Sequence, residues 1–588
     1  MTPADDHDDY DEHPEDRHLL RWGLGVTFRL ATPHVLGLLA GLAFSGCMVA
    51  AFDPFNLWPL IFVAPLPLVL LARASDRARA AVWAGVGSGG MWAWFSWWMW
   101  TVTAAGTPAL IAHQMIFVAL FVWLISGMHR RAPAVGMSIV VPIIWTGIEV
   151  LRGSVLWDGY PWYLLAHPLI DAEPLHRPAA LGGAYLVSFL VAAWSGIVVD
   201  ALRRPRSRAL LVQQGIVAAI VAGVWAIAAL LPMPAATGVV RLAAVQTNVP
   251  VSNKLRWEFA QRVTDFGDFI DLTASAAEED VDAIVWPETM FPGERLDPSA
   301  VAVERGANLV WPNALATGEA LPSTALVDAL LEYQRRIGVP MIVGNTGFDG
   351  FAIDTAGGEI AYDWDAQFNS AFVIDEGRVL DQRYDKMVLT PFGEVMPGIS
   401  RVPWLEQALL ALGAGGMTFE LSAGGAPTVL EVVGRDGGVK RIATPICFEV
   451  TAPKACRDLV FTDGQRRADV MVSLSNDGWF GVFDRGRAHH LRIARWRCVE
   501  LATPMLRSVN TGISSAIDAD GRMLGQLAPR EPGVLAADLP MTSAVTVYGR
   551  IGDAFGFACF TLTAMLALVT LVLDLRREPD EPQEIDAE

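Results

Sequence analysis

Long apolar stretches dominate the first 235 residues of the chain. A membrane-spanning helix needs roughly 20 predominantly apolar residues. Stretches that meet this need lie at about 34–52, 57–72, 81–101, 108–127, 134–151, 179–199, 210–232 and 553–574. The pattern predicts a polytopic α-helical membrane domain of about eight spans. Seven of them fall within residues 31–233 and the last within 552–575.

Between residues 238 and 542 the pattern changes to short apolar strands separated by helical periodicity. Strands are expected in VVRLAAVQTNV, VDAIVWPET, VPMIVGNTG, VKRIATPICFEV and ADVMVSLSND, and helices over 255–278, 323–337 and 487–501. Two hairpins are expected to turn at 376–377 and 520–521. Strands alternating with helices indicate a layered α/β domain. Segments 290–322, 349–367 and 400–438 fit no regular element, which predicts long loops.

Basic residues are concentrated in alternate short loops, and such loops stay in the cytoplasm. They are Arg73, Arg77 and Arg79, then Arg130 and Arg131, then Arg203, Arg204, Arg206 and Arg208, with Arg576 and Arg577 after the last span. With eight spans, both termini are expected in the cytoplasm. The α/β domain is then expected on the opposite side of the membrane, which in a bacterium is the periplasmic side of the inner membrane.

Charge and composition exclude some function classes. The net charge of −19 argues against a nucleic-acid partner, because a phosphate backbone requires a basic surface. The terminal segments 1–30 and 576–588 are acidic and poor in apolar residues, so we expect disordered cytoplasmic tails. The chain contains neither CxxC nor HExxH, so no metal site is predicted. Whether Cys456 and Cys498 form a disulfide is left open.

Three chemically distinct side chains follow predicted strands. Glu288 ends VWPE, Lys386 follows the first hairpin, and Cys447 ends TPIC. In layered α/β domains the strand ends border a common crevice. A carboxylate, an ammonium and a thiol brought together there would form a base, an electrostatic stabiliser and a nucleophile. Each also has a structural interpretation: a buried cysteine is often inert, the glutamate could cap a helix, and the lysine could form a surface ion pair.

The motifs around these residues resemble those of a known superfamily. WPET, DKMVLTPFGEVMPG, PICFE, SNDGWFG and HHLRIARWRCVELATPMLRSVNTG together are similar to the nitrilase superfamily, and the added spans resemble its membrane branch, the apolipoprotein N-acyltransferases. The resemblance implies an αββα sandwich with a catalytic triad of Glu288, Lys386 and Cys447. Further positions that it implies, for substrate binding or for support of the triad, are Trp257, Glu394, Phe448 and Glu449. Phe448 departs from the family pattern, in which a tyrosine is frequent.

The resemblance also implies a reaction. An acyl chain would pass from a membrane phospholipid to the nucleophilic cysteine as a thioester, and then to the α-amine of a diacylglyceryl lipoprotein. No cofactor is implied, and a monomer embedded in the membrane is expected. Two other interpretations remain open at this point: a membrane-tethered amidase of the nitrilase type, and a transporter with a non-catalytic periplasmic binding domain.

Overall fold

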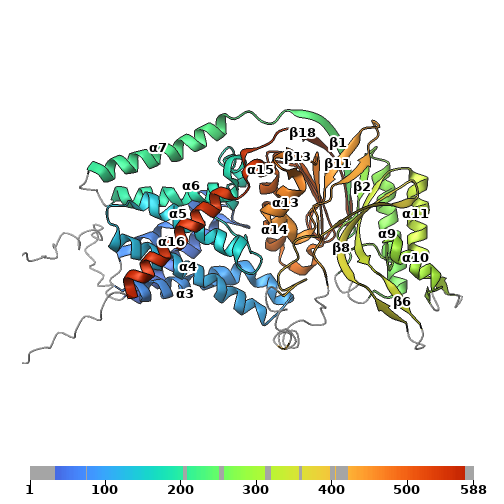
Figure 1. Ribbon diagram of the computed structural model, residues 1–588, viewed down its shortest axis with the longest axis horizontal. Coiled ribbons are helices and arrows are strands. Elements are labelled where there is room, and N and C mark those ends of the chain that lie inside the picture. The colour runs from blue at the N-terminus through green and yellow to red at the C-terminus, as the bar shows by residue number, and fades with distance from the viewer. Residues whose placement is uncertain are drawn as a thin grey trace, which may run out of the picture.

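The computed structural model describes residues 33–73, 76–202, 208–250, 257–311, 320–355, 360–396, 404 and 421–575. The predicted acidic tails and most of the basic loop at 203–208 lie outside these residues. A bundle of helices and an α/β sandwich lie end to end, so the sandwich adjoins one end of the bundle (Figure 1).

Apolar helices build the bundle. They are α1 (Pro33–Ala51), α3 (Arg77–Ser96), α4 (Gly106–Arg131), α5 (Met137–Val150), α6 (Ala179–Leu202), α7 (Arg208–Leu230) and α16 (Ala554–Leu575). Six described helices are long and apolar enough to cross a membrane, and α3 is not among them. Helix α7 runs along the outside of the bundle before the chain enters the sandwich (Figure 1). Helices α1 and α3 approach closely at Gly41, where an added Cβ would lie 2.3 Å from the carbonyl oxygen of Ala84.

The predicted span at 57–72 is wrong as a single helix. The segment folds into η2 (Trp58–Phe62) and α2 (Leu66–Leu70), followed by η3 (Leu71–Arg73). Pro59, Pro65 and Pro67 explain the interruption, because each lacks a backbone N–H and its ring clashes with the preceding turn. The expected α-helical membrane domain is therefore confirmed. The expected number of about eight spans differs from the six described helices that are long and apolar enough to cross a membrane.

Two six-stranded sheets form the centre of the α/β part. In spatial order, the first contains β18 (Gly533–Thr542), β1 (Ala236–Gln246), β2 (Ala283–Val285), β5 (Met341–Asp349), β8 (Ala366–Asp375) and β9 (Arg378–Asp385). The second contains β10 (Leu430–Val433), β11 (Val439–Ala443), β14 (Val470–Ser475), β15 (Met505–Val509), β16 (Ser515–Ile517) and β17 (Met523–Gln526). Strands β1, β2 and β5 run parallel, as do β11, β14 and β15. The other pairings within the two sheets are antiparallel.

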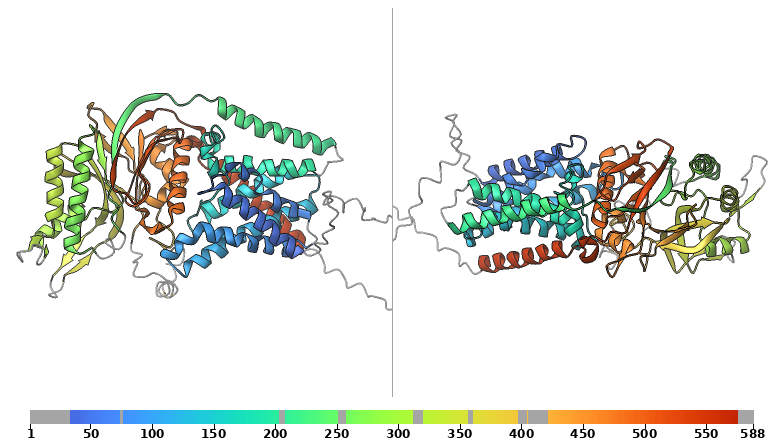
Figure 2. Two further views of the ribbon diagram at one scale, coloured as in Figure 1. Left: turned by 180° about the vertical axis from the view of Figure 1, so that it is seen from behind. Right: turned by 90° about the horizontal axis from the view of Figure 1, so that it is seen from above.

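Helices cover the outer face of each sheet. Helices α9 (Phe259–Ala277) and α11 (Ala325–Ile337) lie far from the bundle, whereas α13 (Pro453–Val460) and α14 (Asp484–Leu501) lie between the second sheet and the bundle (Figures 1 and 2). Apolar side chains from both sheets, among them Val285, Ile342, Ile442 and Val472, share one buried core. The expected αββα sandwich is thus confirmed.

Two of the segments predicted to be irregular, 290–322 and 349–367, contain short elements, and most of the third, 400–438, lies outside the described residues. The short elements include α10 (Pro298–Gly306), the hairpin of β3 (Val310–Trp311) with β4 (Leu321–Pro322), and the hairpin of β6 (Ala352–Asp354) with β7 (Ala361–Asp363). Strands of two or three residues are too short for a hydrophobic period to reveal. The turn at Glu376 and Gly377 is confirmed, since both residues have positive φ, of 53° and 72°.

Helix α14 anchors the sandwich to the bundle. The loop between η5 (Leu151–Val155) and η6 (His167–Asp171) packs on it, and the backbone N–H of Tyr163 donates to His489 Nε2 at 3.0 Å. At the end of α14, Glu500 accepts a hydrogen bond from the N–H of Ala184 in α6 at 2.8 Å. Buried polar contacts of this kind fix one orientation of the two parts, because each has a specific geometry.

Candidate active site

Glu288 lies three residues beyond β2, where it contacts residues of both sheets, and only 5% of it is exposed. Its Oε1 accepts a hydrogen bond from Asn369 Nδ2 at 2.7 Å, and its Oε2 accepts one from the backbone N–H of Asn476 at 2.9 Å. Strand β5 passes directly beneath it at Gly344, where an added Cβ would lie 2.9 Å from the Cα of Glu288. The glycine therefore leaves room for the segment that carries the carboxylate.

Lys386 follows β9 directly and is completely buried. Its Nζ lies 2.7 Å from Glu394 Oε2 and 3.8 Å from Glu288 Oε1. Burial alone would lower the pKa of Lys386, but the two carboxylates raise it above its usual value. In turn, burial acts to raise the pKa of Glu394, but Lys386 and the hydrogen bonds from Thr390 lower it overall. The lysine is thus a permanent cation at neutral pH.

Cys447 lies beyond β11, at the start of η7 (Cys447–Thr451), and is partly exposed. Its φ of +52° belongs to the left-handed region, which is uncommon for a residue other than glycine and typical of functional sites. Burial raises the pKa of its thiol and so does the charge of Glu288, whereas Lys386 lowers it. Because the net shift is upward, the sulfur holds its proton at rest and needs a base when it attacks.

Glu449 joins the segments that carry the lysine and the cysteine. Its Oε1 accepts hydrogen bonds from the N–H groups of Met387 at 2.9 Å and Val388 at 3.1 Å, and its Oε2 accepts one from Ile446 at 3.0 Å. The carboxylate is completely buried. These hydrogen bonds fix the backbone next to Lys386 and next to Cys447. Glu449 therefore holds the segments that carry the two reactive groups in place.

The other two residues singled out by the resemblance, Phe448 and Trp257, make no described hydrogen bond to the charged cluster. Phe448 follows the cysteine and is 8% exposed. Trp257 lies just before α9, where its Nε1 donates to Asp265 at 2.6 Å and its ring lies 5.5 Å from the guanidinium carbon of Arg262. The contacts described for Trp257 join it to this helix and do not connect it to the charged cluster.

Asn369 and Thr390 belong to the site although the sequence did not single them out. Asn369 donates to both glutamates, reaching Glu394 Oε1 at 3.2 Å as well as Glu288. Thr390 donates to Glu394 Oε2 through its N–H at 2.8 Å and through its hydroxyl at 2.9 Å. An asparagine inside an otherwise apolar strand, as in FNSAFVI, is a usable signal, because a buried amide requires partners.

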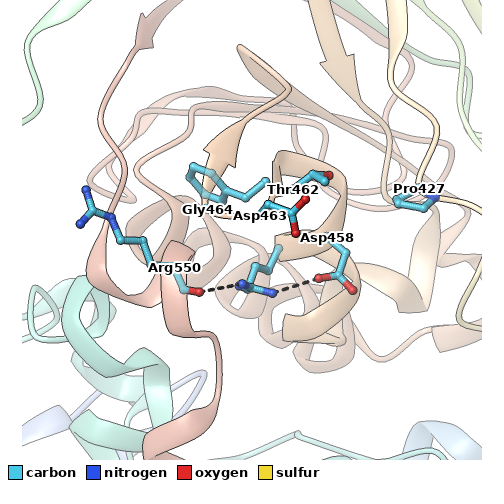
Figure 3. Close-up of a pocket in the computed structure, with 8 residues that line it drawn as sticks. Pro427, Asp458, Thr462, Asp463, Gly464 and Arg550 are labelled. Atoms are coloured by element: carbon cyan, nitrogen blue, oxygen red, sulfur yellow. Dashed lines mark hydrogen bonds and ion pairs between the residues drawn. The ribbon is translucent and has the colours of Figure 1, made fainter.

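Of the remaining cysteines, Cys456, Cys498 and Cys559 are buried and Cys47 is partly exposed. Cys456 and Cys498 are both free, so the pairing left open by the sequence does not form. A surface hollow of about 720 Å³ lies beside α13 and α15 (Val547–Ile551). In it, Arg457 bonds to Asp458 and to the carbonyl of Arg550, and the eight lining residues include no member of the triad (Figure 3).

Comparison with known proteins agrees with this architecture. A model of the carbon-nitrogen hydrolase family matches residues 241–547, and a model of the apolipoprotein N-acyltransferase N-terminal domain matches residues 44–197. Two similar proteins, from Vibrio vulnificus and Rhodopseudomonas palustris, are each named apolipoprotein N-acyltransferase and are each 27% identical. The first alignment covers 87% of this chain and 92% of the relative, and the second covers 93% and 95%.

A solved amidase of the nitrilase superfamily from Nesterenkonia AN1 is also similar, with a TM-score of 0.33 and 18% identity over 53% of this chain and 93% of the amidase. The family model that covers residues 241–547 spans more than half of the chain. The chain therefore belongs to the carbon-nitrogen hydrolase family and carries the N-terminal domain of the apolipoprotein N-acyltransferases.

Proposed function

We propose that this bacterial membrane protein is an N-acyltransferase that acylates the N-terminal amine of apolipoproteins, with Cys447 as its nucleophile. The names of its relatives and the two family models support the reaction. The charged cluster of Glu288, Lys386 and Glu394 beside Cys447 is the observation that supports the mechanism. The triad comes from a single chain, so we infer that a monomer suffices.

In the first step, the sulfur of Cys447 attacks the ester carbonyl of a phospholipid. Glu288 accepts the thiol proton as the S–C bond forms, which the raised pKa of the thiol makes necessary. Lys386 stabilises the negative charge that develops on the carbonyl oxygen. The C–O bond then breaks, Glu288 returns the proton to the leaving oxygen, and a lysophospholipid departs.

In the second step, the α-amine of the diacylglyceryl-cysteine attacks the thioester. Glu288 accepts a proton from the nitrogen as the N–C bond forms, and Lys386 again stabilises the oxygen. The C–S bond breaks and the amide leaves, after which the sulfur recovers its proton. Both substrates are anchored by acyl chains, so the adjoining helical bundle keeps the reacting groups near the site and reduces the entropy lost on encounter (Figure 1).

This chemistry requires the sandwich to face the periplasm, where exported lipoproteins are found. The arginine-rich loops support this orientation, with both termini in the cytoplasm of the bacterial cell and the protein in the inner membrane.

The test is direct detection of the intermediate. Purified protein in detergent is given a phospholipid of defined chains, and the peptide containing Cys447 is weighed by mass spectrometry. We expect the added acyl mass without an acceptor, and its transfer to a diacylglyceryl-cysteine peptide when one is supplied. Cys456→Ala and Cys498→Ala serve as matched controls and should behave as wild type. Acyl transfer by Cys447→Ala would overturn the mechanism, and transfer to water alone would indicate a hydrolase.

A further inference from the structure

Two adjacent histidines, His489 and His490, lie on α14 where the sandwich meets the bundle. Both are buried, at 1% and 2% exposure. Neither belongs to the triad. They differ in what they contact, because consecutive residues on a helix point in different directions.

His490 reaches the nucleophile. Its Nε2 lies 3.2 Å from the backbone carbonyl oxygen of Cys447, and its Nδ1 lies 3.0 Å from Asp477 Oδ1. A carbonyl oxygen can only accept a hydrogen bond, so the Nε2–H group of His490 is the donor to the carbonyl oxygen of Cys447. The ring stacks on Trp162 of the bundle, with centroids 5.9 Å apart and planes inclined by 19°. The imidazole is thus held on its face as well as at both nitrogens.

Asp477 and Arg507 hold the far side of the ring. Asp477 is 1% exposed and also accepts a hydrogen bond from Ser475 at 2.8 Å. Burial acts to raise the pKa of Asp477, but His490 and Arg507 lower it to about 2, so the group is a carboxylate at neutral pH. The guanidinium of Arg507 lies 3.3 Å from Nδ1 and 3.8 Å from Asp477 Oδ2. The ring therefore has one orientation, with Nε2 directed at the nucleophile's own peptide.

That peptide also carries a donor. The carbonyl of Cys447 and the N–H of Phe448 belong to one planar unit and point in opposite directions in the trans form. Fixing the carbonyl therefore fixes the N–H. Phe448 is in the first turn of η7, where N–H groups have no acceptor within the helix. A hydrogen bond to the carbonyl also polarises the peptide and strengthens its N–H as a donor.

We propose that His490 is a positioning residue for acyl transfer, which holds the Cys447 carbonyl so that the Phe448 N–H faces the oxyanion opposite Lys386. The inference rests on the proposed function, because it assumes that Cys447 is acylated. His490 does not touch the substrate. It acts through the peptide that follows the nucleophile, and the left-handed φ of Cys447 is the conformation that this contact maintains.

His489 offers a matched control in the same turn of the same helix. Its Nε2 accepts from the N–H of Tyr163, its ring stacks on Tyr163 at 3.9 Å, and burial lowers its pKa well below the usual value. It is therefore a neutral interface residue. Its described contacts lead to the bundle and none leads to Cys447.

The first measurement compares His490→Gln with His489→Gln in thioester formation. We expect kcat to fall roughly 10- to 100-fold in His490→Gln, less than the loss of a whole oxyanion donor, with the KM for phospholipid unchanged. We expect kcat of His489→Gln to stay close to wild type. A wild-type kcat for His490→Gln, or an equal loss in both variants, would overturn the proposal.

The second measurement separates positioning of the peptide from an effect on the thiol. Alkylation of Cys447 by iodoacetamide forms no oxyanion, so His490→Gln should slow alkylation much less than acylation. An equal loss in both reactions would overturn the proposal. If His490→Gln does not fold, Asp477→Asn tests the same ring through its other nitrogen and should also lower kcat with KM unchanged. An unaltered kcat in Asp477→Asn would contradict the inference.

Comparing Cys447→Ala with His490→Gln also separates the positioning role of His490 from the proposed function. Cys447→Ala is expected to abolish transfer whatever His490 does. Inactive Cys447→Ala together with a fully active His490→Gln would remove the positioning role and leave the proposed function intact. Active Cys447→Ala would remove both.

Discussion

Replacing Lys386 by methionine keeps most of the side-chain volume and removes the ammonium from the centre of the site. In the wild-type protein, Nζ lies 2.7 Å from Glu394 and 3.8 Å from Glu288. Without it, the buried Glu288 and the partly buried Glu394 share a site with no cation between them. Breaking a buried ion pair on one side lowers the free energy of unfolding by about 3–5 kcal/mol. Loss of one oxyanion donor lowers the rate about 10²–10³-fold, or about 3–4 kcal/mol in the barrier.

These two effects can be separated in a second variant. Lys386→Met with Glu394→Gln removes both charges of the closer pair, so only the more distant Glu288 remains without a cation and stability should largely return. The rate should not return, because the oxyanion still lacks its cation. Thermal unfolding in detergent measures the first quantity, and mass-spectrometric counting of thioester on Cys447 measures the second.

Lys386→Arg completes the series. A planar guanidinium does not replace a compact ammonium in a fully buried pocket, so we expect no recovery of thioester formation. Nearly wild-type rates in Lys386→Arg would refute the reasoning, since the lysine would then supply only a general charge. Nearly wild-type rates in Lys386→Met would refute it too, since the charge would then not be needed at all. Activity that returned together with stability in the double variant would refute it equally.

Three further predictions concern support, pH and topology. Glu449→Gln places an amide where three backbone N–H groups now donate, so we expect the free energy of unfolding to fall by about 1–3 kcal/mol and thioester formation to slow, measured by unfolding and mass spectrometry. The pKa of Glu394 is lowered on folding, so its stabilisation is present above the ordinary value of 4.5 and is lost as the pH falls below it; Glu394→Gln should flatten the acid side of the melting-temperature profile. A reporter active only in the periplasm should work when fused after residue 240 and fail after residue 578, and the reverse result would sink the proposed orientation.

Hydropathy along the chain was sufficient to locate most of the membrane helices and the regular elements of the sandwich. Both are local properties, because a span requires a continuous apolar run and a buried strand requires alternating or continuous apolar residues. The prediction of secondary structure failed where a few individual residues, or very short elements, are hidden by hydropathy averaged over a longer stretch. The prolines at 59, 65 and 67 divide one apolar run into short helices, and strands of two or three residues escaped notice in segments expected to be loops.

The triad residues could be named from strand ends and motifs, and the structure brings Glu288 and Lys386 within 3.8 Å of each other. Their positions, however, depend on partners remote in sequence. Asn369 is 81 residues from the glutamate to which it donates, and Asn476 is 188 residues away. The contact of His490 with the Cys447 carbonyl joins residues 43 apart, on different elements. Such contacts exist only after the two sheets and α14 have packed together, because hydrogen bonding and desolvation act through space and leave no periodic trace in the sequence.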